Sequence, residues 1–186
     1  MPTGRRLNQW LHRASHHMDA LTIRLSKKPD GSVVFSCTRP DGSTTWQKHQ
    51  RHAEFFPLHD LSHLAVETTL GLRSGFYGLL ARGWNITDFG NRTIPADAAY
   101  EAALAEAVVG LLDGERAVGQ PYGTAEFNRA LATSLGHAEQ TLEWHVTDED
   151  LDAIRSAWLS LAGQWARVAV GEDLILVFEP QPAGAV

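Results

Sequence analysis

The tripeptide Pro-Asp-Gly occurs twice, at residues 29–31 and 40–42, and each copy stands between short runs of β-type sequence. Proline presets φ at the first position of a turn, and glycine accepts the positive φ that closes it. Residues 21–25 alternate apolar and polar side chains, which is typical of a half-buried strand. Residues 32–38 and 43–47 predict two more short strands, so this part of the chain predicts an antiparallel meander.

The middle of the chain has the pattern of several helices. They are predicted at residues 58–70, 76–82, 96–112, 124–135 and from 147 onward. Gly71 is expected to end the first helix. Thr147, with Asp150 three residues later, resembles a capping box at the start of the last helix. A linker rich in Gly and Pro is expected at residues 115–123.

Residues 174–178 form a nearly continuous apolar run, which predicts a strand buried on both faces. We therefore expect this strand to join the meander in the interior of the sheet. The sequence predicts an α+β fold, in which a small antiparallel sheet, made of the N-terminal meander and the C-terminal strand, is packed by four or five helices. One domain is expected at residues 19–180, with an N-terminal extension at 1–18 and a tail at 181–186.

Two segments each allow two interpretations. The N-terminal extension is either a short amphipathic helix or an upstream extension of a chain that naturally starts at Met18, in which case the first 17 residues are not native. The helix interpretation depends on the spacing of Leu7, Trp10, Leu11 and Ala14. The loop at residues 84–90 holds two aromatic side chains, which either line a pocket over the first predicted helix or pin the loop into the core.

The composition narrows the class of protein. The formal net charge of −6 argues against a general nucleic-acid binder, which needs a basic face to neutralise phosphates. The chain has no run of about 18 apolar residues, so no membrane-spanning helix is expected. Cys37 is the only cysteine, which excludes an intramolecular disulfide and a zinc site built on several thiolates. We expect a cytoplasmic protein that acts on a small molecule, and the sequence is also compatible with a homo-oligomer.

His59 and His63 stand four residues apart in the first predicted helix, so both imidazoles lie on one face of that helix. Histidines at this spacing supply two metal ligands in many zinc sites. Asp60 stands where an HExxH metalloprotease has its catalytic Glu, so this is not that class of enzyme. We expect a divalent metal cofactor, zinc first, with iron or manganese as alternatives that also accept mixed imidazole and carboxylate ligands.

Glu67 lies one further turn along the same helix and is the candidate third ligand. A straight helix places the Cα atoms of His59 and Glu67 about 12 Å apart, so Glu67 reaches the same ion only if its side chain leans back. Otherwise it holds the imidazole of His63 in place or acts as a general base through water. Asp60 points about 100° away from His59 and is expected to orient another group or to bind the metal where the helix begins. Glu67 and Asp60 are therefore the candidate catalytic residues.

Another segment must complete such a site. His49 and His52 precede the helix by a few residues, in a polar link that could fold back onto it. Glu106 lies inside an apolar run and needs a partner if it is buried. His137 and His145 are further candidates.

The run FFPLHDLSHLAVETTLGL, with DGSTTW before it and GW-N-I-x-D-F after it, resembles a family of small, uncharacterised bacterial proteins. The likeness covers about residues 20–112, and it implies that the HDLSH-x3-E helix is the centre of the family without implying an activity. A weaker, local likeness is to the HDxxH zinc motif of the ubiquinone-biosynthesis scaffold family. That motif continues with a Glu after eleven residues, where this chain has Gly75, so one ligand of that motif is missing.

Two hypotheses for the function follow. The first is a metal-dependent enzyme of the hydrolase type, in which His59 and His63 bind the metal and a metal-bound water is the nucleophile. The second is a non-catalytic module, in which the His, Asp and Glu side chains form a buried polar network or a protein-binding surface.

Overall fold

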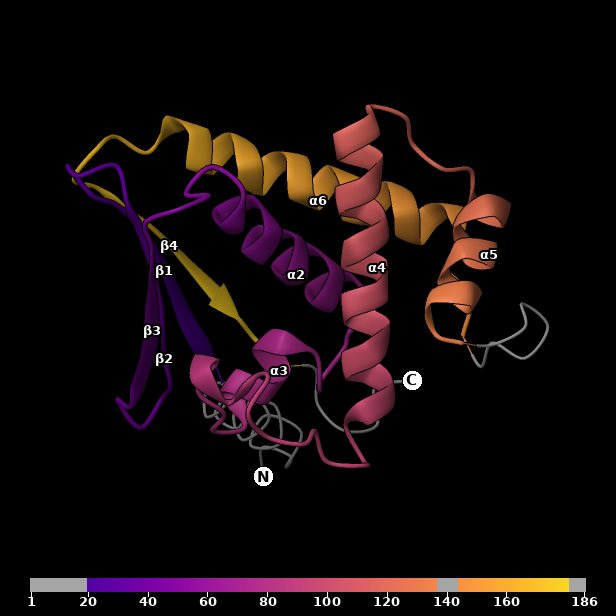
Figure 1. Cartoon of the computed structure of the whole chain (residues 1–186), viewed down its shortest axis with the longest axis horizontal. Coiled ribbons are helices and arrows are strands. Elements are labelled where there is room, and N and C mark those ends of the chain that lie inside the picture. Colours follow the sequence, from indigo (N-terminus) through magenta and orange to yellow (C-terminus); the bar gives the residue numbers. More distant parts are fainter. Residues whose placement is uncertain (1–19, 137–143, 181–186) are drawn as a thin grey trace, which may run out of the picture.

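The computed structural model describes residues 20–136 and 144–180 of the 186-residue chain. The predicted N-terminal extension, the C-terminal tail and His137 lie outside these ranges. The elements in chain order are β1 (Leu21–Lys27), β2 (Val33–Thr38), β3 (Thr44–His49), α2 (Phe56–Leu70), α3 (Phe76–Ala81), the 3-10 turn η1 (Ile86–Asp88), α4 (Ala99–Val118), α5 (Thr124–Ser134), α6 (Asp148–Arg167) and β4 (Asp173–Phe178) (Figure 1). The described residues confirm the predicted α+β fold with one antiparallel sheet.

The sheet has the strand order β3-β2-β1-β4, and every neighbouring pair is antiparallel. The two Pro-Asp-Gly turns connect its first three strands and confirm the predicted meander. Gly31 and Gly42 have φ of 77° and 83°, a conformation that strains any residue with a Cβ. Asp30 and Asp41 accept hydrogen bonds from the backbone N–H two residues later, which stabilises both turns.

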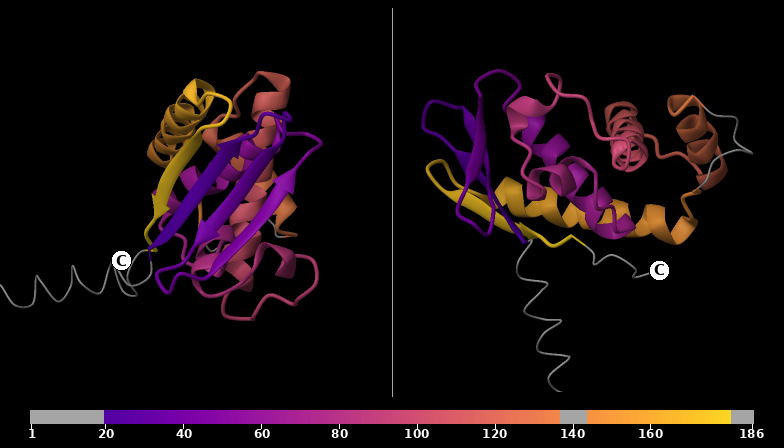
Figure 2. Two further views of the ribbon diagram at one scale, coloured as in Figure 1. Left: turned by 90° about the vertical axis from the view of Figure 1, so that its left-hand side faces the viewer. Right: turned by 90° about the horizontal axis from the view of Figure 1, so that it is seen from below.

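Strand β4 lies at the edge of the sheet and pairs only with β1, so the prediction of an interior position is wrong. Its side chains alternate, and Ile175 and Val177 are 53% and 55% exposed. These two face outward beside Arg24 and Thr22, on the face of the sheet that the described helices leave uncovered (Figure 2). An apolar run predicts burial on both faces only when both faces of the sheet are covered, and here the helices pack on one.

Helix α2 lies at the centre of the molecule, between the sheet and the other long helices (Figure 1). One side of it packs through Leu61 and Leu64 against the inward side chains of β1 and β2, such as Ile23 and Phe35. Its other side packs through Val66, together with Ala65, against α4 and α6, in a core cluster to which α5 also contributes. Because α2 is buried on both sides, any polar residue in its first half must find a partner or face a hollow.

Three element boundaries differ from the predictions in ways that affect the candidate site. Strand β3 extends to His49, which therefore belongs to the sheet and not to a link that folds back. Helix α4 continues past Asp113 to Val118, where Gly119 in the left-handed conformation ends it. A glycine inside a helix costs only about 1 kcal/mol, so Gly114 is tolerated there. Helix α2 begins at Phe56, with Pro57 in its first turn.

The capping box at Thr147 and Asp150 is confirmed, since each side chain bonds the backbone N–H of the other residue. In the loop at residues 84–90, Trp84 is buried, as the core interpretation predicts. Phe89 contacts both Trp84 and Phe76, and in this way joins the loop to the neighbourhood of α2. No helix in the described ranges has the length and apolar character needed to cross a membrane.

Cys37 on β2 is fully buried, and burial raises the pKa of its thiol. Because thiolate is the reactive form, we expect the native protein not to react with a thiol reagent such as dithiobis(nitrobenzoate) and to release one equivalent of chromophore when it is unfolded. Rapid reaction of the native protein would contradict the inward orientation of Cys37.

Candidate site of histidines and carboxylates on helix α2

The polar residues of α2 occupy two adjoining faces of the helix. At about 100° per residue, Asp60, His63 and Glu67 fall within an arc of about 60°, and His59 lies to one side of that arc. All three residues of the arc are buried, whereas the side chain of His59 is 27% exposed. His59 therefore occupies an outer position that faces α4. Asp60, His63 and Glu67 form an inner row that faces α3 and the sheet.

His59 is bonded to α4. Its Nδ1 lies 2.7 Å from Oδ2 of Asp113, and the other oxygen of this carboxylate is paired with Arg116. Arg116 also donates a hydrogen bond of 2.7 Å to the hydroxyl of Ser62. Burial alone would raise the pKa of Asp113, but the hydrogen bond with His59 and the charge of Arg116 hold it below its ordinary value. Nε2 of His59 has no hydrogen-bond partner among the described residues and is left available.

His63 lies between two carboxylates. Its Nδ1 is 3.5 Å from Oε1 of Glu67, which is too long for a well-formed hydrogen bond, and this buried nitrogen has no other partner in the described part of the chain. Its Nε2 is 3.7 Å from Oε1 of Glu106 on α4. Burial would lower the pKa of His63, but Glu67, Glu106 and Asp60 together raise it above its ordinary value.

Glu67 is fully buried, and both its oxygens are occupied by backbone groups. Oε1 accepts a hydrogen bond of 3.2 Å from the N–H of Tyr77, and Oε2 accepts one of 3.1 Å from the N–H of Gly78. A Cβ at Gly75 would lie 2.5 Å from Cδ of Glu67, so only glycine fits there. The position at which the ubiquinone-biosynthesis scaffold motif has a Glu is thus the position against which Glu67 packs.

Asp60 faces the sheet. Its Oδ2 lies 4.0 Å from Nε2 of His49 on β3, and this oxygen has no hydrogen-bond partner among the described residues. Burial raises the pKa of Asp60 to about 7, against the opposing effect of His63 and His59. Burial also lowers the pKa of His49, whose ring stacks on Phe56 with 4.5 Å between centroids.

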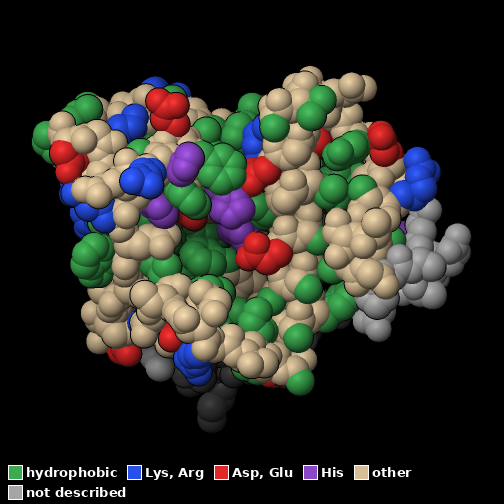
Figure 3. Space-filling model, viewed as in Figure 1, with side chains coloured by type: hydrophobic (Ala, Val, Ile, Leu, Met, Phe, Trp, Pro, Cys, Tyr) green, Lys and Arg blue, Asp and Glu red, His purple; other side chains and the backbone are tan. Residues whose placement is uncertain are grey.

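The more exposed members of this group, His59 and Glu106, lie at the surface above the buried ones. Figure 3 shows histidines in a hollow between the sheet and α4, with acidic side chains on the α4 side and apolar side chains around them. Phe55 stacks on His59, and Phe76 lies beside His63 with 5.4 Å between ring centroids. The hollow therefore offers imidazole and carboxylate groups together with aromatic surface.

The structure brings together His49, Asp60, His59, His63, Glu67 and Glu106. His52 is not part of this group. It has a φ of 56° and contacts the edge of the Phe56 ring, and it forms no ion pair among the described residues. His145 is exposed in the segment before α6 and forms no ion pair there either.

Asp113 is not among the residues predicted for the site, because the helix predicted at residues 96–112 ends before it, at Asp113-Gly114. A usable signal was present: Glu106 and Asp113 stand seven residues apart, so both lie on one face of α4. Glu106 was expected to need a partner if buried, but its side chain is 60% exposed and faces His63.

The geometry bears on the metal prediction in two ways. No group of three or more His, Cys, Asp or Glu side chains is already gathered around one point in residues 20–136 and 144–180. Two pairs lie farther apart than hydrogen-bonded atoms do. Nε2 of His63 is 3.7 Å from Oε1 of Glu106, and Nε2 of His49 is 4.0 Å from Oδ2 of Asp60. Two atoms that each lie about 2 Å from one tetrahedral ion are about 3.3 Å apart, so each pair must close by about 0.4–0.7 Å to share an ion.

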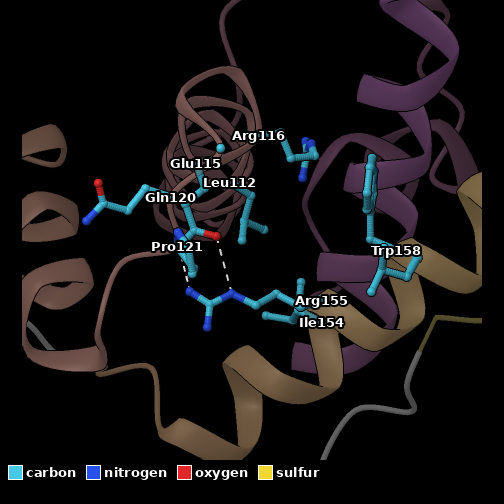
Figure 4. Close-up of a pocket in the computed structure, with 10 residues that line it drawn as sticks. Leu112, Glu115, Arg116, Gln120, Pro121, Ile154, Arg155 and Trp158 are labelled. Carbon is cyan, nitrogen blue, oxygen red and sulfur yellow. Dashed lines mark hydrogen bonds and ion pairs between the residues drawn. The ribbon is translucent and has the colours of Figure 1, made fainter.

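A second hollow, of about 280 Å³, lies between the end of α4 and α6 (Figure 4). Its lining is mostly apolar, with Trp158 and Ile154 among the contributors. Its charged groups are already paired, because Arg155 bonds both oxygens of Glu115 and Arg116 pairs with Asp113. This pocket therefore offers no unpaired charged group for chemistry.

No family model, no curated protein and no solved structure matches this chain. The resemblance to a family of small bacterial proteins stays a prediction. The function must be argued from the site itself.

Replacing Glu67 with Gln is expected to lower the free energy of unfolding by about 1–3 kcal/mol, because an amide NH2 would face a backbone N–H donor in a fully buried place. The matched control is Glu106→Gln, which changes an exposed carboxylate of the same cluster and should shift stability by less than about 0.5 kcal/mol. Urea unfolding followed by circular dichroism measures both. Equal stability of the two variants would contradict the role assigned to Glu67.

Proposed function

We propose that the hollow binds a divalent metal ion through Nε2 of His59, Nε2 of His63 and the carboxylate of Glu106. The observation that carries this proposal is that a carboxylate lies beside Nδ1 of each imidazole, with Asp113 at 2.7 Å from that of His59 and Glu67 at 3.5 Å from that of His63. Metal-binding histidines commonly have such a carboxylate, which fixes the tautomer and leaves Nε2 for the ion.

Glu106 is suited to complete the ligand set. It lies 3.7 Å from Nε2 of His63, and its side chain is 60% exposed and so is free to rotate toward an ion. Two imidazoles and one carboxylate form the ligand set of many catalytic zinc sites, and the same set also suits iron or manganese. Zinc is the first choice.

In this proposal Glu67 is a positioning residue and not a ligand. Both its oxygens accept backbone hydrogen bonds from α3, and its side chain has no exposed surface. We therefore favour the alternative in which Glu67 holds the imidazole of His63 in place.

The reaction class that fits this site is hydrolysis of a small molecule. An ion with three protein ligands keeps a position for water, lowers the pKa of that water and polarises a bound carbonyl or phosphoryl oxygen. The aromatic rings of Phe55 and Phe76 beside the histidines supply apolar surface for a substrate.

A second candidate function is a non-catalytic module, and one observation favours it. The carboxylates of Glu67 and Asp113 are satisfied without a metal, by the amides of α3 and by Arg116. In that case the cluster is a polar network that joins α2 to α3 and α4.

Metal analysis of protein purified without a histidine tag separates the two candidates. We expect at least one equivalent of bound metal per chain, with loss of that metal from His63→Ala and weaker retention in Glu106→Ala. His145→Ala removes an exposed histidine outside the cluster and should keep the metal content of the wild type. Protein that stays free of metal, and whose melting temperature is unchanged by zinc, iron or manganese, would rule out the metal site.

Hydrolysis is tested on the metal-loaded protein with a panel of ester, amide and phosphoester substrates. We expect turnover of one class, abolished by a chelator and restored by the metal. Full metal content without turnover of any class would overturn the hydrolase assignment.

A further inference from the structure

Asp60 differs from the other buried carboxylates of the described chain, because one of its oxygens has no hydrogen-bond partner. Glu67 is satisfied by two backbone amides, and Glu115 by Arg155 and the N–H of Tyr122. Oδ2 of Asp60 is the one carboxylate oxygen in the described ranges that is buried without a hydrogen-bond partner. An unpaired oxygen of this kind is costly to bury, and a bound cation would offset that cost.

The nearest candidate for a second ligand atom belongs to a different element. Nε2 of His49, on β3, lies 4.0 Å from Oδ2 of Asp60, and both side chains are less than one-tenth exposed. This separation is too long for a hydrogen bond, and a movement of about 0.7 Å would bring the two atoms to the spacing of two ligands on one tetrahedral ion. The stacking of His49 on Phe56 holds the imidazole in this orientation.

Gln47 supplies a third donor group. The nitrogen of its side-chain amide, Nε2, lies 3.0 Å from Nε2 of His49, on the same face of β3, and these two atoms share a hydrogen bond. Rotation of the amide by 180° would exchange this nitrogen for the amide oxygen, which binds hard cations. Imidazole, carboxylate and amide oxygen together form a ligand set for a divalent cation.

We infer that Asp60, His49 and Gln47 form a second divalent-cation subsite, so that the hollow binds two metal ions. This inference rests on the proposed function, because the first ion is the one bound by His59 and His63. Asp60 follows His59 directly and shares a helix face with His63, so one turn of α2 supplies ligands to both ions. Hydrolytic sites with two metals hold them about 3.5–4 Å apart and stabilise both the attacking and the leaving oxygen.

The experiment is metal stoichiometry of the full, tag-free chain, equilibrated with zinc and dialysed. We expect two equivalents in the wild type and one in Asp60→Asn. His49→Phe should also bind one equivalent, because phenylalanine keeps the stacking on Phe56 and removes the ligand nitrogen. His52→Gln, which changes a neighbouring histidine outside both ligand sets, should bind two.

The outcomes distinguish the two proposals. No bound metal in the wild type overturns both. One equivalent in the wild type, retained in Asp60→Asn and lost in His63→Ala, supports the first site and overturns the second. Two equivalents that persist in Asp60→Asn and in His49→Phe also overturn the second subsite.

A spectroscopic measurement on the wild type does not depend on the folding of any variant. Two Mn²⁺ ions in adjacent subsites are exchange-coupled, so we expect a multiline electron paramagnetic resonance spectrum at full loading. The six-line spectrum of isolated Mn²⁺ at full loading would contradict adjacent ions.

Discussion

The buried carboxylate of Glu67 is the interaction on which the site depends. It has no exposed surface, so its burial must be offset by the two backbone N–H groups that begin α3 and by the nearby imidazole of His63. This contact fixes α3 against α2 and requires glycine at position 75. Tyr77, placed by the same contact, donates from its hydroxyl to the carbonyl of Asp60. The orientation of Asp60, His63 and Glu67 on α2 therefore depends on one carboxylate, that of Glu67.

The fold could be predicted from the sequence where local chemistry decides the structure. The Pro-Asp-Gly turns, the alternation in β1 and the capping box at Thr147 each depend on residues within a few positions of one another. The edge position of β4 could not be predicted in this way. It depends on which face of the sheet the helices cover, and a run of apolar residues does not encode that. The continuation of α4 past Asp113 has a similar cause, since contacts with α2 outweigh a local stop signal.

Some features of the site are likewise set by local sequence, and others are set by long-range packing. The spacing of His59 and His63 on one helix face could be predicted, because it depends only on helix periodicity. Their carboxylate partners could not all be found, since Asp113 meets His59 only after α4 packs along α2. The place of His49 depends on the register of β3 against β2, in which His49 stands opposite Val33. Long-range packing thus decides which acid faces which imidazole.

The separation of Asp60 from His59 has a mechanistic consequence. Adjacent residues on a helix differ by about 100° in direction and about 1.5 Å in height, so their side chains serve two neighbouring regions while sharing one rigid backbone. His59 reaches α4, where Arg116 and solvent moderate the charge of its partner Asp113. Asp60 reaches the interior beside His49, where no arginine or lysine of the described chain pairs with it. The same helix turn therefore holds a carboxylate in a dry region and imidazoles at an open hollow. In the two-metal proposal, Asp60 and His49 would act on a substrate in the hollow through the cation that they bind.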